Sequence, residues 1–209
     1  MVANLFFIDY EATGHNPYFD TITEVAIKKI FTDDYYQSLV IPDENGIYYK
    51  YVSNKIIELT GITNEMIEKD GINRDISLFN TIEYIKKNSS MGPIFLIAHN
   101  GNNFDFILLK KMISEYKGGN ILDINIINRI RYIDTLNLAR AYLYHEKCNQ
   151  PGLCKKYQIN NVDQHRAYGD ILALEKLYQI MCEQFSYFKK KCKTYYLYQP
   201  DKLIQDLFI

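Results

Sequence analysis

Apolar and polar positions follow two different periods along the chain, and the order of these periods predicts the architecture. Runs with the composition of β-strands come first, at residues 4–11, 21–31 and 35–41. Apolar residues at helical spacing then alternate with short apolar runs. Helices are expected at 54–60, 64–69, 75–88, 104–116, 135–142, 151–157 and 167–185, and strands at 94–98 and 131–133. The pattern predicts an α/β fold in which three antiparallel strands, and then parallel strands, form a mixed sheet flanked by α-helices.

Three parts of the chain give weaker signals. Residues 43–51 are expected to be irregular, while 121–130 and the lysine- and tyrosine-rich tail at 188–209 receive no assignment. In the helix at 75–88, the apolar stripe is expected to contain Ile76, Phe79, Ile82 and Ile85.

Four acidic residues lie where the pattern predicts side chains that face the core. Asp9 and Glu11 end an apolar strand and share one face, because side chains alternate along a strand. Asp105 and Asp170 each begin an apolar stripe at helical spacing, so both belong to the core-facing sides of their helices.

Each of these carboxylates has a simpler explanation when taken alone. Asp9 and Glu11 can point into water at a strand end, Asp105 can favour a helix dipole, and Asp170 can pair with Arg166. Several core-facing carboxylates without matching cations nevertheless favour a divalent metal site. Ligands that are all oxygen favour Mg²⁺ or Mn²⁺ over zinc.

Composition narrows the class of protein. The 209 residues, 47% hydrophobic and 23% charged, suit one globular domain with a core. No apolar run reaches about 18 residues, so neither a membrane span nor a membrane partner is expected. The apolar start lacks the basic flank of a signal peptide. The net charge of −1 differs from the strongly basic balance of proteins that hold nucleic acid by phosphate contacts alone, a balance that binding through metals and a pocket does not need.

The cysteines and the residue bias bear on the cellular setting. Cys148, Cys154, Cys182 and Cys192 include no Cys-x-x-Cys pair and are expected to be free thiols in a reducing compartment. A zinc ion held by His145, Cys148 and Cys154 is an alternative, although the spacing fits no standard site. The abundance of Asn, Ile, Lys and Tyr indicates an AT-rich genome, with a virus as one source. We therefore expect an intracellular protein, cytoplasmic or nuclear.

Three short blocks carry a family resemblance. Residues 7–14 read FIDYEATG, residues 98–105 read AHNGNNFD and residues 165–170 read HRAYGD. These resemble D-x-E-T/A-T-G, A-H-N-x-x-x-F-D and H-x-A-x-x-D of the DnaQ-like exonuclease family, in its DEDDh branch. Weaker similarity at 59–63 and 133–136 extends the resemblance over about residues 5–181 and leaves the tail outside. Three blocks in this order are far more specific than Asp-x-Glu alone.

The resemblance implies a ribonuclease H-like fold, with one exonuclease domain at 1–185 and a C-terminal extension at 186–209. It implies two Mg²⁺ or Mn²⁺ ions held by Asp9, Glu11 and Asp170, with Asp9 bridging both ions and Asp105 acting through water. A lone histidine is more often structural, but His165 in this block is similar to the family's general base. The implied reaction is 3′→5′ hydrolysis by a two-metal mechanism, which releases nucleoside 5′-monophosphates.

The resemblance also implies a set of substrate contacts, for which packing within loops is the alternative. These residues are Ala12, Thr13, His15, Leu59, Thr60, Asn100, Asn103 and Phe104. His15 stands where many relatives have a leucine that separates the last two bases, which puts strand-end unpairing in doubt. Two lysine-rich stretches, 189–196 and Lys155–Lys156, are candidates for binding a nucleic acid strand by charge and stacking. A solvated surface is the alternative.

The substrate expected from these features is DNA, as single strands or 3′ ends. The first two blocks resemble the three-prime repair (TREX-like) DNA exonucleases. An RNA-trimming exoribonuclease and a polymerase-associated proofreading exonuclease are the alternatives, and an inactive nucleic-acid-binding module is the remote one. The sequence leaves monomer and homodimer open.

Overall fold

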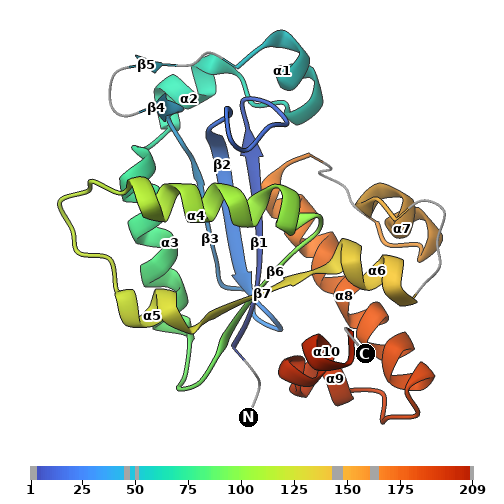
Figure 1. Ribbon diagram of the computed structural model, residues 1–209. Coiled ribbons are helices and arrows are strands. Elements are labelled where there is room, and N and C mark those ends of the chain that lie inside the picture. The colour runs from blue at the N-terminus through green and yellow to red at the C-terminus, as the bar shows by residue number, and fades with distance from the viewer. Residues whose placement is uncertain (1–3, 45–47, 50–51, 143–147, 161–164, 208–209) are drawn as a thin grey trace.

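The computed structural model describes residues 4–44, 48–49, 52–142, 148–160 and 165–207. Its centre is a five-stranded sheet with the order β3-β2-β1-β6-β7. The strands are β1 Asn4–Ala12, β2 Ile22–Lys29, β3 Tyr35–Leu39, β6 Ile94–Ala98 and β7 Ile130–Asp134. The first three are antiparallel, whereas β6 and β7 run parallel to β1. The predicted mixed sheet, with antiparallel strands followed by parallel ones, is confirmed (Figure 1).

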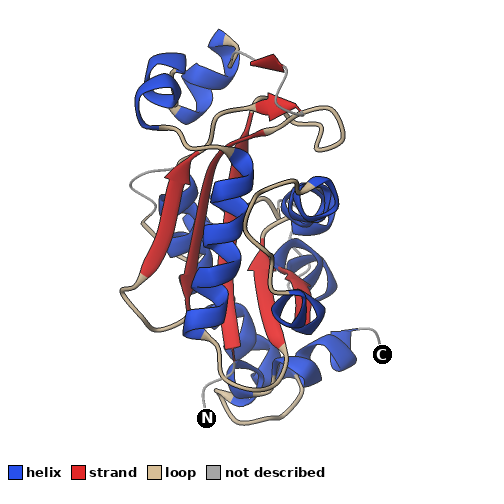
Figure 2. Ribbon diagram, turned by 90° about the vertical axis from the view of Figure 1, so that its left-hand side faces the viewer, coloured by secondary structure: helices blue, strands red, loops and turns tan. Residues whose placement is uncertain are grey.

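Helices cover both faces of this sheet (Figure 2). They are α1 Asn54–Thr60, α2 Asn64–Asp70, α3 Arg74–Asn88, α4 Asp105–Glu115, α5 Ile124–Arg129, α6 Thr135–Tyr142, α7 Gln150–Lys156, α8 Ala167–Phe188, α9 Tyr195–Tyr198 and α10 Pro200–Leu207. One core cluster joins the sheet to α3, α4 and α5, and another joins it to α6 and α8. Helices α1 and α2 lie beyond the ends of β1 and β2 (Figure 1).

The alternation of side chains along β1 decides which face receives the functional residues. Phe6 and Ile8 pack into the cluster of α3 and α4. Leu5 and Phe7 pack into the cluster of α8. Because the period of a strand is two residues, Asp9 continues the face of Leu5 and Phe7 toward α8.

Two details differ from the sequence predictions. The sequence predicts Ile76 in the apolar stripe of α3, but its side chain is half exposed. The buried face of α3 also includes Ser77, Leu78 and Thr81, which were not predicted. Polar side chains that bond within the core can replace apolar ones, and the hydroxyl of Thr81 donates to the carbonyl of Ser77. The segment expected to be irregular contains a two-stranded pair, β4 Asp43–Glu44 with β5 Tyr48–Tyr49.

The C-terminal helices pack on the end of α8. Tyr196 is fully buried, and its ring stacks on Phe185 with the centroids 4.4 Å apart. The hydroxyl of Tyr196 donates to Asp206 Oδ2 at 2.6 Å, and Leu203 is buried in the α8 cluster. The division of the chain near residue 185 stays a prediction, since α8 itself continues to Phe188. Among the described helices, none has both the length and the apolar character that crossing a membrane requires.

Candidate metal centre and substrate pocket

Three carboxylates meet where β1 ends beside the first turn of α8. Asp9, Glu11 and Asp170 each present an oxygen, and these oxygens all lie within 4.8 Å of one another. The donors are all carboxylate oxygens, which is the ligand set that hard divalent cations prefer. These residues therefore fit Mg²⁺ or Mn²⁺, and no other such group occurs among the residues that the structure describes.

Without a cation, this cluster is electrostatically unfavourable. Burial is the main reason why the pKa of Asp9 is raised well above its ordinary value, and the charges of Asp105 and Glu11 raise it further. Burial, followed by the charge of Asp170, raises the pKa of Glu11 to about 9, while the cation of Arg166 acts in the opposite direction. A bound cation would offset this repulsion directly.

The raised pKa of Glu11 predicts how the stability of the metal-free protein depends on pH. In the unfolded chain this carboxyl ionises near pH ~4.3, but in the folded chain it keeps its proton to about 9. The folded state then binds more protons, so its free energy of unfolding should fall as pH rises between about 6.5 and 8.5. Thermal melts in EDTA should show this fall, and added Mn²⁺ should raise the melting temperature more at the higher pH. A metal-free protein that becomes more stable over this range would contradict the prediction.

Asp105 stands apart from the three-carboxylate cluster. It is the first residue of α4, is almost fully buried and accepts a hydrogen bond from the backbone N–H of Tyr10 at 3.0 Å through Oδ1. Burial raises the pKa of Asp105 to about 7, and the Tyr10 bond partly opposes that rise. This bond ties the start of α4 to β1 beside Asp9. A water-mediated role for Asp105 stays a prediction.

His165 lies on the wall of the same site in a left-handed backbone conformation, with φ +63°. The backbone N–H of His165 donates to Asp170 Oδ2 at 2.9 Å. The bond fixes one oxygen of a proposed metal ligand relative to the turn that carries the imidazole. A non-glycine residue in this conformation is uncommon, so the turn is held by its surroundings.

These residues open into a cavity of about 560 Å³, a volume suited to a small ligand. Six of the predicted substrate contacts line it: Ala12, His15, Leu59, Thr60, Asn100 and Phe104. Thr13 and Asn103 are not among the lining residues. The hydroxyl of Thr13 donates to Asp20 Oδ1 at 3.1 Å, and the amide of Asn103 donates to Asn100 Oδ1 at 2.8 Å. Both side chains shape the loops that line the cavity, and their contact with substrate stays a prediction.

Asp134 organises the loop that carries the second sequence block. Its carboxylate accepts hydrogen bonds from the backbone N–H groups of Asn100 at 2.9 Å and Asn102 at 3.0 Å. It also accepts from the N–H of Leu136 at 2.9 Å, so Asp134 caps α6. One buried side chain thus joins the end of β7 to the loop before Asp105.

Gln150 also contacts the carboxylate cluster, although no sequence pattern indicates it. From the first turn of α7, its Nε2 donates to the backbone oxygen of Asp170 at 2.9 Å and to Oδ1 at 3.3 Å. A glutamine in a first helical turn carries no distinctive pattern, so only the tertiary structure reveals this contact.

Glu24 was also missed, although an acidic residue inside an apolar strand is a detectable signal. It lies opposite Glu11 in the β1–β2 pairing and is 1% exposed. Its Oε1 accepts from Arg166 Nη2 at 2.6 Å, and its Oε2 accepts from the N–H of Ala167 at 3.0 Å. The Glu24–Arg166 pair therefore anchors the start of α8, and with it the turn of His165, to the neighbour of Glu11.

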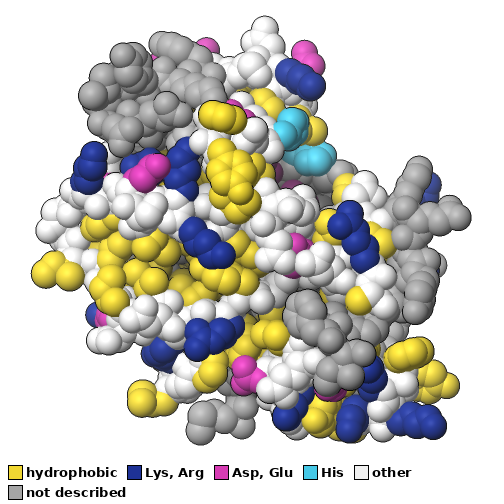
Figure 3. All heavy atoms as spheres, viewed as in Figure 1, with side chains coloured by type: hydrophobic (Ala, Val, Ile, Leu, Met, Phe, Trp, Pro, Cys, Tyr) yellow, Lys and Arg dark blue, Asp and Glu magenta, His cyan; other side chains and the backbone are white. Residues whose placement is uncertain are grey.

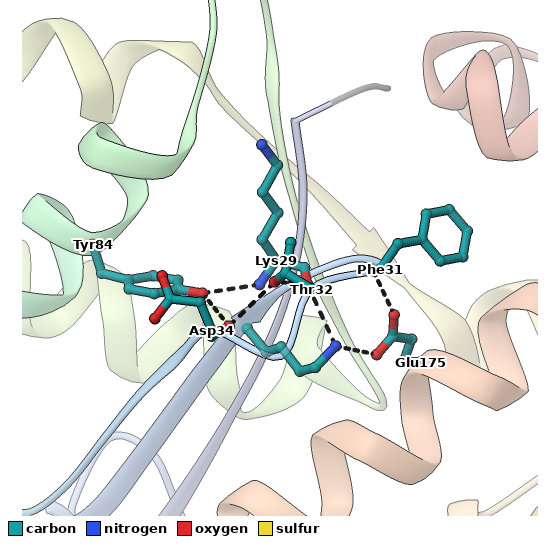
Figure 4. A network of polar contacts seen from close by, with 7 residues as sticks. Lys29, Phe31, Thr32, Asp34, Tyr84 and Glu175 are labelled. Atoms are coloured by element: carbon teal, nitrogen blue, oxygen red, sulfur yellow. Dashed lines mark hydrogen bonds and ion pairs between the residues drawn. The ribbon is translucent and has the colours of Figure 1, made fainter. Parts of the chain in front are cut away.

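A second buried pair joins the same two elements farther along. Lys28 Nζ lies 2.5 Å from Glu175 Oε2, and both side chains are nearly inaccessible. Glu175 also reaches the turn after β2, where Oε1 accepts from the N–H of Phe31 (Figure 4). The two pairs make the same kind of contact, but the pair with Glu24 is the one beside the carboxylate cluster.

Exchanging each glutamate for glutamine should separate positioning from stability. Glu24→Gln removes the charge that holds Arg166, which is then free to neutralise Glu11 in place of a cation. We expect Mn²⁺ affinity and hydrolysis to fall roughly 10–100-fold, as for other partners of metal ligands. Glu175→Gln leaves Lys28 buried and should cost about 3 kcal/mol or more of stability. Its loss of activity, measured well below the melting temperature, should stay under roughly three-fold. Calorimetric Mn²⁺ titration and urea unfolding of both variants test this, and equal losses of Mn²⁺ affinity would refute a specific role for Glu24.

The lysine-rich stretch at 189–196 lies away from the cavity, whereas Lys155 and Lys156 end the short helix whose Gln150 and Pro151 line it. Lys189 follows α8 at roughly 28 Å along the helix from Asp170, at a rise of about 1.5 Å per residue. The ammonium of Lys193 lies 3.0 Å from Glu183, and buried Tyr196 has no free ring face for a base. Lys155 is exposed at the end of α7. The geometry favours a solvated surface for residues 189–196.

The alternative zinc site falls partly outside the described residues, because His145 is not among them. Cys148 and Cys154 are both buried, and the four cysteines form no disulfide among the described residues. Burial raises the pKa of Cys154, which disfavours the thiolate that zinc binds.

Comparison with known proteins identifies relatives of this arrangement. A family model described as an exonuclease (RNase_T) matches residues 6–178. The PolC-type DNA polymerase III of Bacillus subtilis is 32% identical over 171 residues, which is 78% of this chain and 10% of that polymerase. The Arabidopsis thaliana exonuclease DPD1 of chloroplasts and mitochondria is 29% identical over 82% of this chain and 54% of its own length. The chain thus spans about a tenth of its PolC-type relatives.

Solved structures show the same fold. Escherichia coli exonuclease I in complex with a dT13 oligonucleotide superposes with a TM-score of 0.69 at 14% identity. The match covers 94% of this chain and 43% of that one.

Proposed function

This chain belongs to the RNase_T exonuclease family, and from that premise we propose that it is a metal-dependent 3′→5′ exonuclease acting on DNA. The observation that carries the proposal is the meeting of Asp9, Glu11 and Asp170 within 4.8 Å at a cavity that His165 also lines. The preference for DNA is supported by the similar proteins, among which are DNA polymerases and an exonuclease bound to a dT oligonucleotide.

The proposed cofactors are two divalent cations, Mg²⁺ or Mn²⁺, held by Asp9, Glu11 and Asp170 with Asp105 acting through water. When bound, such ions lower the pKa of water and shield the charge that develops on a phosphodiester. The imidazole of His165 accepts the proton of the attacking water as a general base. The product of this hydrolysis is a nucleoside 5′-monophosphate.

The chain's own residues hold the terminal nucleotide in the cavity. Leu59 and Phe104 offer apolar surface to the base and sugar, while Asn100 offers an amide. His15 is exposed at the rim of the cavity. It stands at the position where many relatives have a leucine that separates the last two bases. We infer a preference for single strands, because an imidazole separates paired bases less effectively than a branched apolar side chain.

A parallel assay on three substrates tests the proposal. Single-stranded DNA, duplex DNA and RNA, each labelled at the 3′ end, are incubated with Mg²⁺, Mn²⁺ or EDTA. Label should be released from single-stranded DNA only with a metal, while a 5′ label on the same strand should remain on progressively shorter products. Purified protein that leaves all three substrates intact would overturn the enzyme assignment. Faster release of label from RNA than from DNA would indicate an RNA-trimming exonuclease.

Proofreading is a second candidate, favoured by similarity to a segment of PolC-type DNA polymerases. It predicts faster removal of a mismatched 3′ nucleotide than of a paired one on the same primer. Equal rates would argue for an enzyme that acts apart from a polymerase. A monomer and a homodimer are both compatible with either role.

A further inference from the structure

The loop between β1 and β2 displays two neighbouring aromatic side chains to solvent. Tyr18 is 68% exposed and Phe19 is 73% exposed, so neither contributes much to the core. Packing these rings against a ligand would remove their apolar surface from water, which is favourable.

Hydrogen bonds within the loop hold its backbone in one shape. The N–H groups of Phe19 and Asp20 both donate to the carbonyl of Asn16, at 3.0 and 2.7 Å. The side chain of Asn16 accepts from the N–H of Tyr18, and that of Asp20 accepts from the N–H of Asn16. The Asp20 carboxylate also lies 2.4 Å from where a Cβ on Gly14 would be, so the loop closes tightly. The rings are therefore presented on an ordered support.

The same loop forms part of the cavity wall. Gly14 and His15 line the cavity, only three to five residues before the two rings. From α4, Lys111 Nζ donates to the carbonyl of Tyr18 at 3.3 Å and to that of Asp20 at 3.4 Å, which places a positive charge against the backbone of this loop. Figure 3 shows histidine and hydrophobic side chains close together on the upper part of this face.

We propose that Tyr18 and Phe19 form an aromatic ledge on which bases of a single strand stack, upstream of the nucleotide in the cavity. This inference rests on the proposed function and adds the strand that leads to the site. A chain with net charge −1 gains little long-range attraction for a polyanion, so stacking has to supply affinity for the strand. The ammonium of Lys111 adds a local attraction for phosphate near this loop.

A matched pair of double variants tests the ledge. The first is Tyr18→Ser with Phe19→Ser, and the control is Tyr187→Ser with Phe188→Ser, another exposed aromatic pair, at the far end of α8. Binding of a fluorescent oligo-dT of about twelve nucleotides is measured by anisotropy with Ca²⁺ in place of Mg²⁺. The ledge variant should bind roughly ten-fold or more weakly, because each stacked base contributes about that factor, and the control should change less than about two-fold. Phe19→Trp should retain the parent's affinity.

The outcomes separate the ledge from the proposed function. If the ledge variant binds the oligonucleotide as tightly as the control, the ledge is overturned and the rings are left for a protein contact. If the parent binds but does not shorten the oligonucleotide with Mg²⁺ or Mn²⁺, the exonuclease proposal fails while anisotropy still decides on the ledge. Thermal melts of both variants should match the parent, since all four rings are exposed.

Discussion

Asp9→Asn is expected to reduce hydrolysis by on the order of a thousand-fold or more, with the domain still folded. The side chain keeps its shape but loses the charge at the centre of the carboxylate cluster. Ions that supply several kcal/mol of transition-state stabilisation are then held poorly, and every ~1.4 kcal/mol lost is a factor of ten in rate. Label release from single-stranded DNA measures the effect.

The same substitution should make the metal-free protein more stable. Burial and four neighbouring carboxylates raise the pKa of Asp9, so an ionised Asp9 destabilises the folded chain, and asparagine removes this cost. In EDTA the melting temperature of Asp9→Asn should exceed that of the parent, and Mn²⁺ should no longer raise it. Asp201→Asn, an exposed change on α10, is the control and should alter neither property. An active Asp9→Asn enzyme would remove Asp9 from the site.

His165→Gly is expected to lower the turnover number roughly 10²–10⁴-fold, the usual contribution of a general base. Glycine is the informative replacement because residue 165 has a φ of +63°, which glycine adopts without strain. The backbone N–H that donates to Asp170 is retained, so Mn²⁺ affinity in a calorimetric titration should stay near that of the parent.

Added imidazole should partly restore the activity of His165→Gly, since the variant leaves a gap of the right shape. His15→Ala provides the contrast, because that side chain lies at the cavity rim and should change the KM for single strands more than the turnover number. Equal turnover in His165→Gly and the parent would remove His165 from the role of base.

Much of the fold could be predicted because the sequence repeats its signal along each element. Five consecutive buried residues mark β6, and the helices α1 and α6 begin and end at the predicted residues. The stripe of α3 was less predictable, since its core side includes Ser77 and Thr81. Hydrophobic periodicity does not register polar side chains that satisfy their own hydrogen bonds within a helix.

The candidate site was predictable to the extent that its residues stand in sequence blocks. Asp9, Glu11 and Asp170 were selected from strand and helix phase, and the structure brings them together. Sequence patterns did not indicate the supporting residues because their partners are distant in the chain. Glu24 and Arg166, for example, are 142 residues apart. The sequence offers Arg166 as a partner for Asp170, and the structure shows the guanidinium of Arg166 bound to Glu24. Such a pairing follows from the sheet register, which no local pattern contains.

The position of α8 has a consequence for how the protein is made. Asp9 and Glu11 lie on β1, whereas Asp170 and the His165 turn belong to the start of α8. A ribosome therefore synthesises every described strand of the sheet before the third carboxylate of the cluster exists. We expect the cluster to be complete only when α8 packs on β1 and β2. Nascent chains that lack α8 therefore contain only two of the three carboxylates of the cluster.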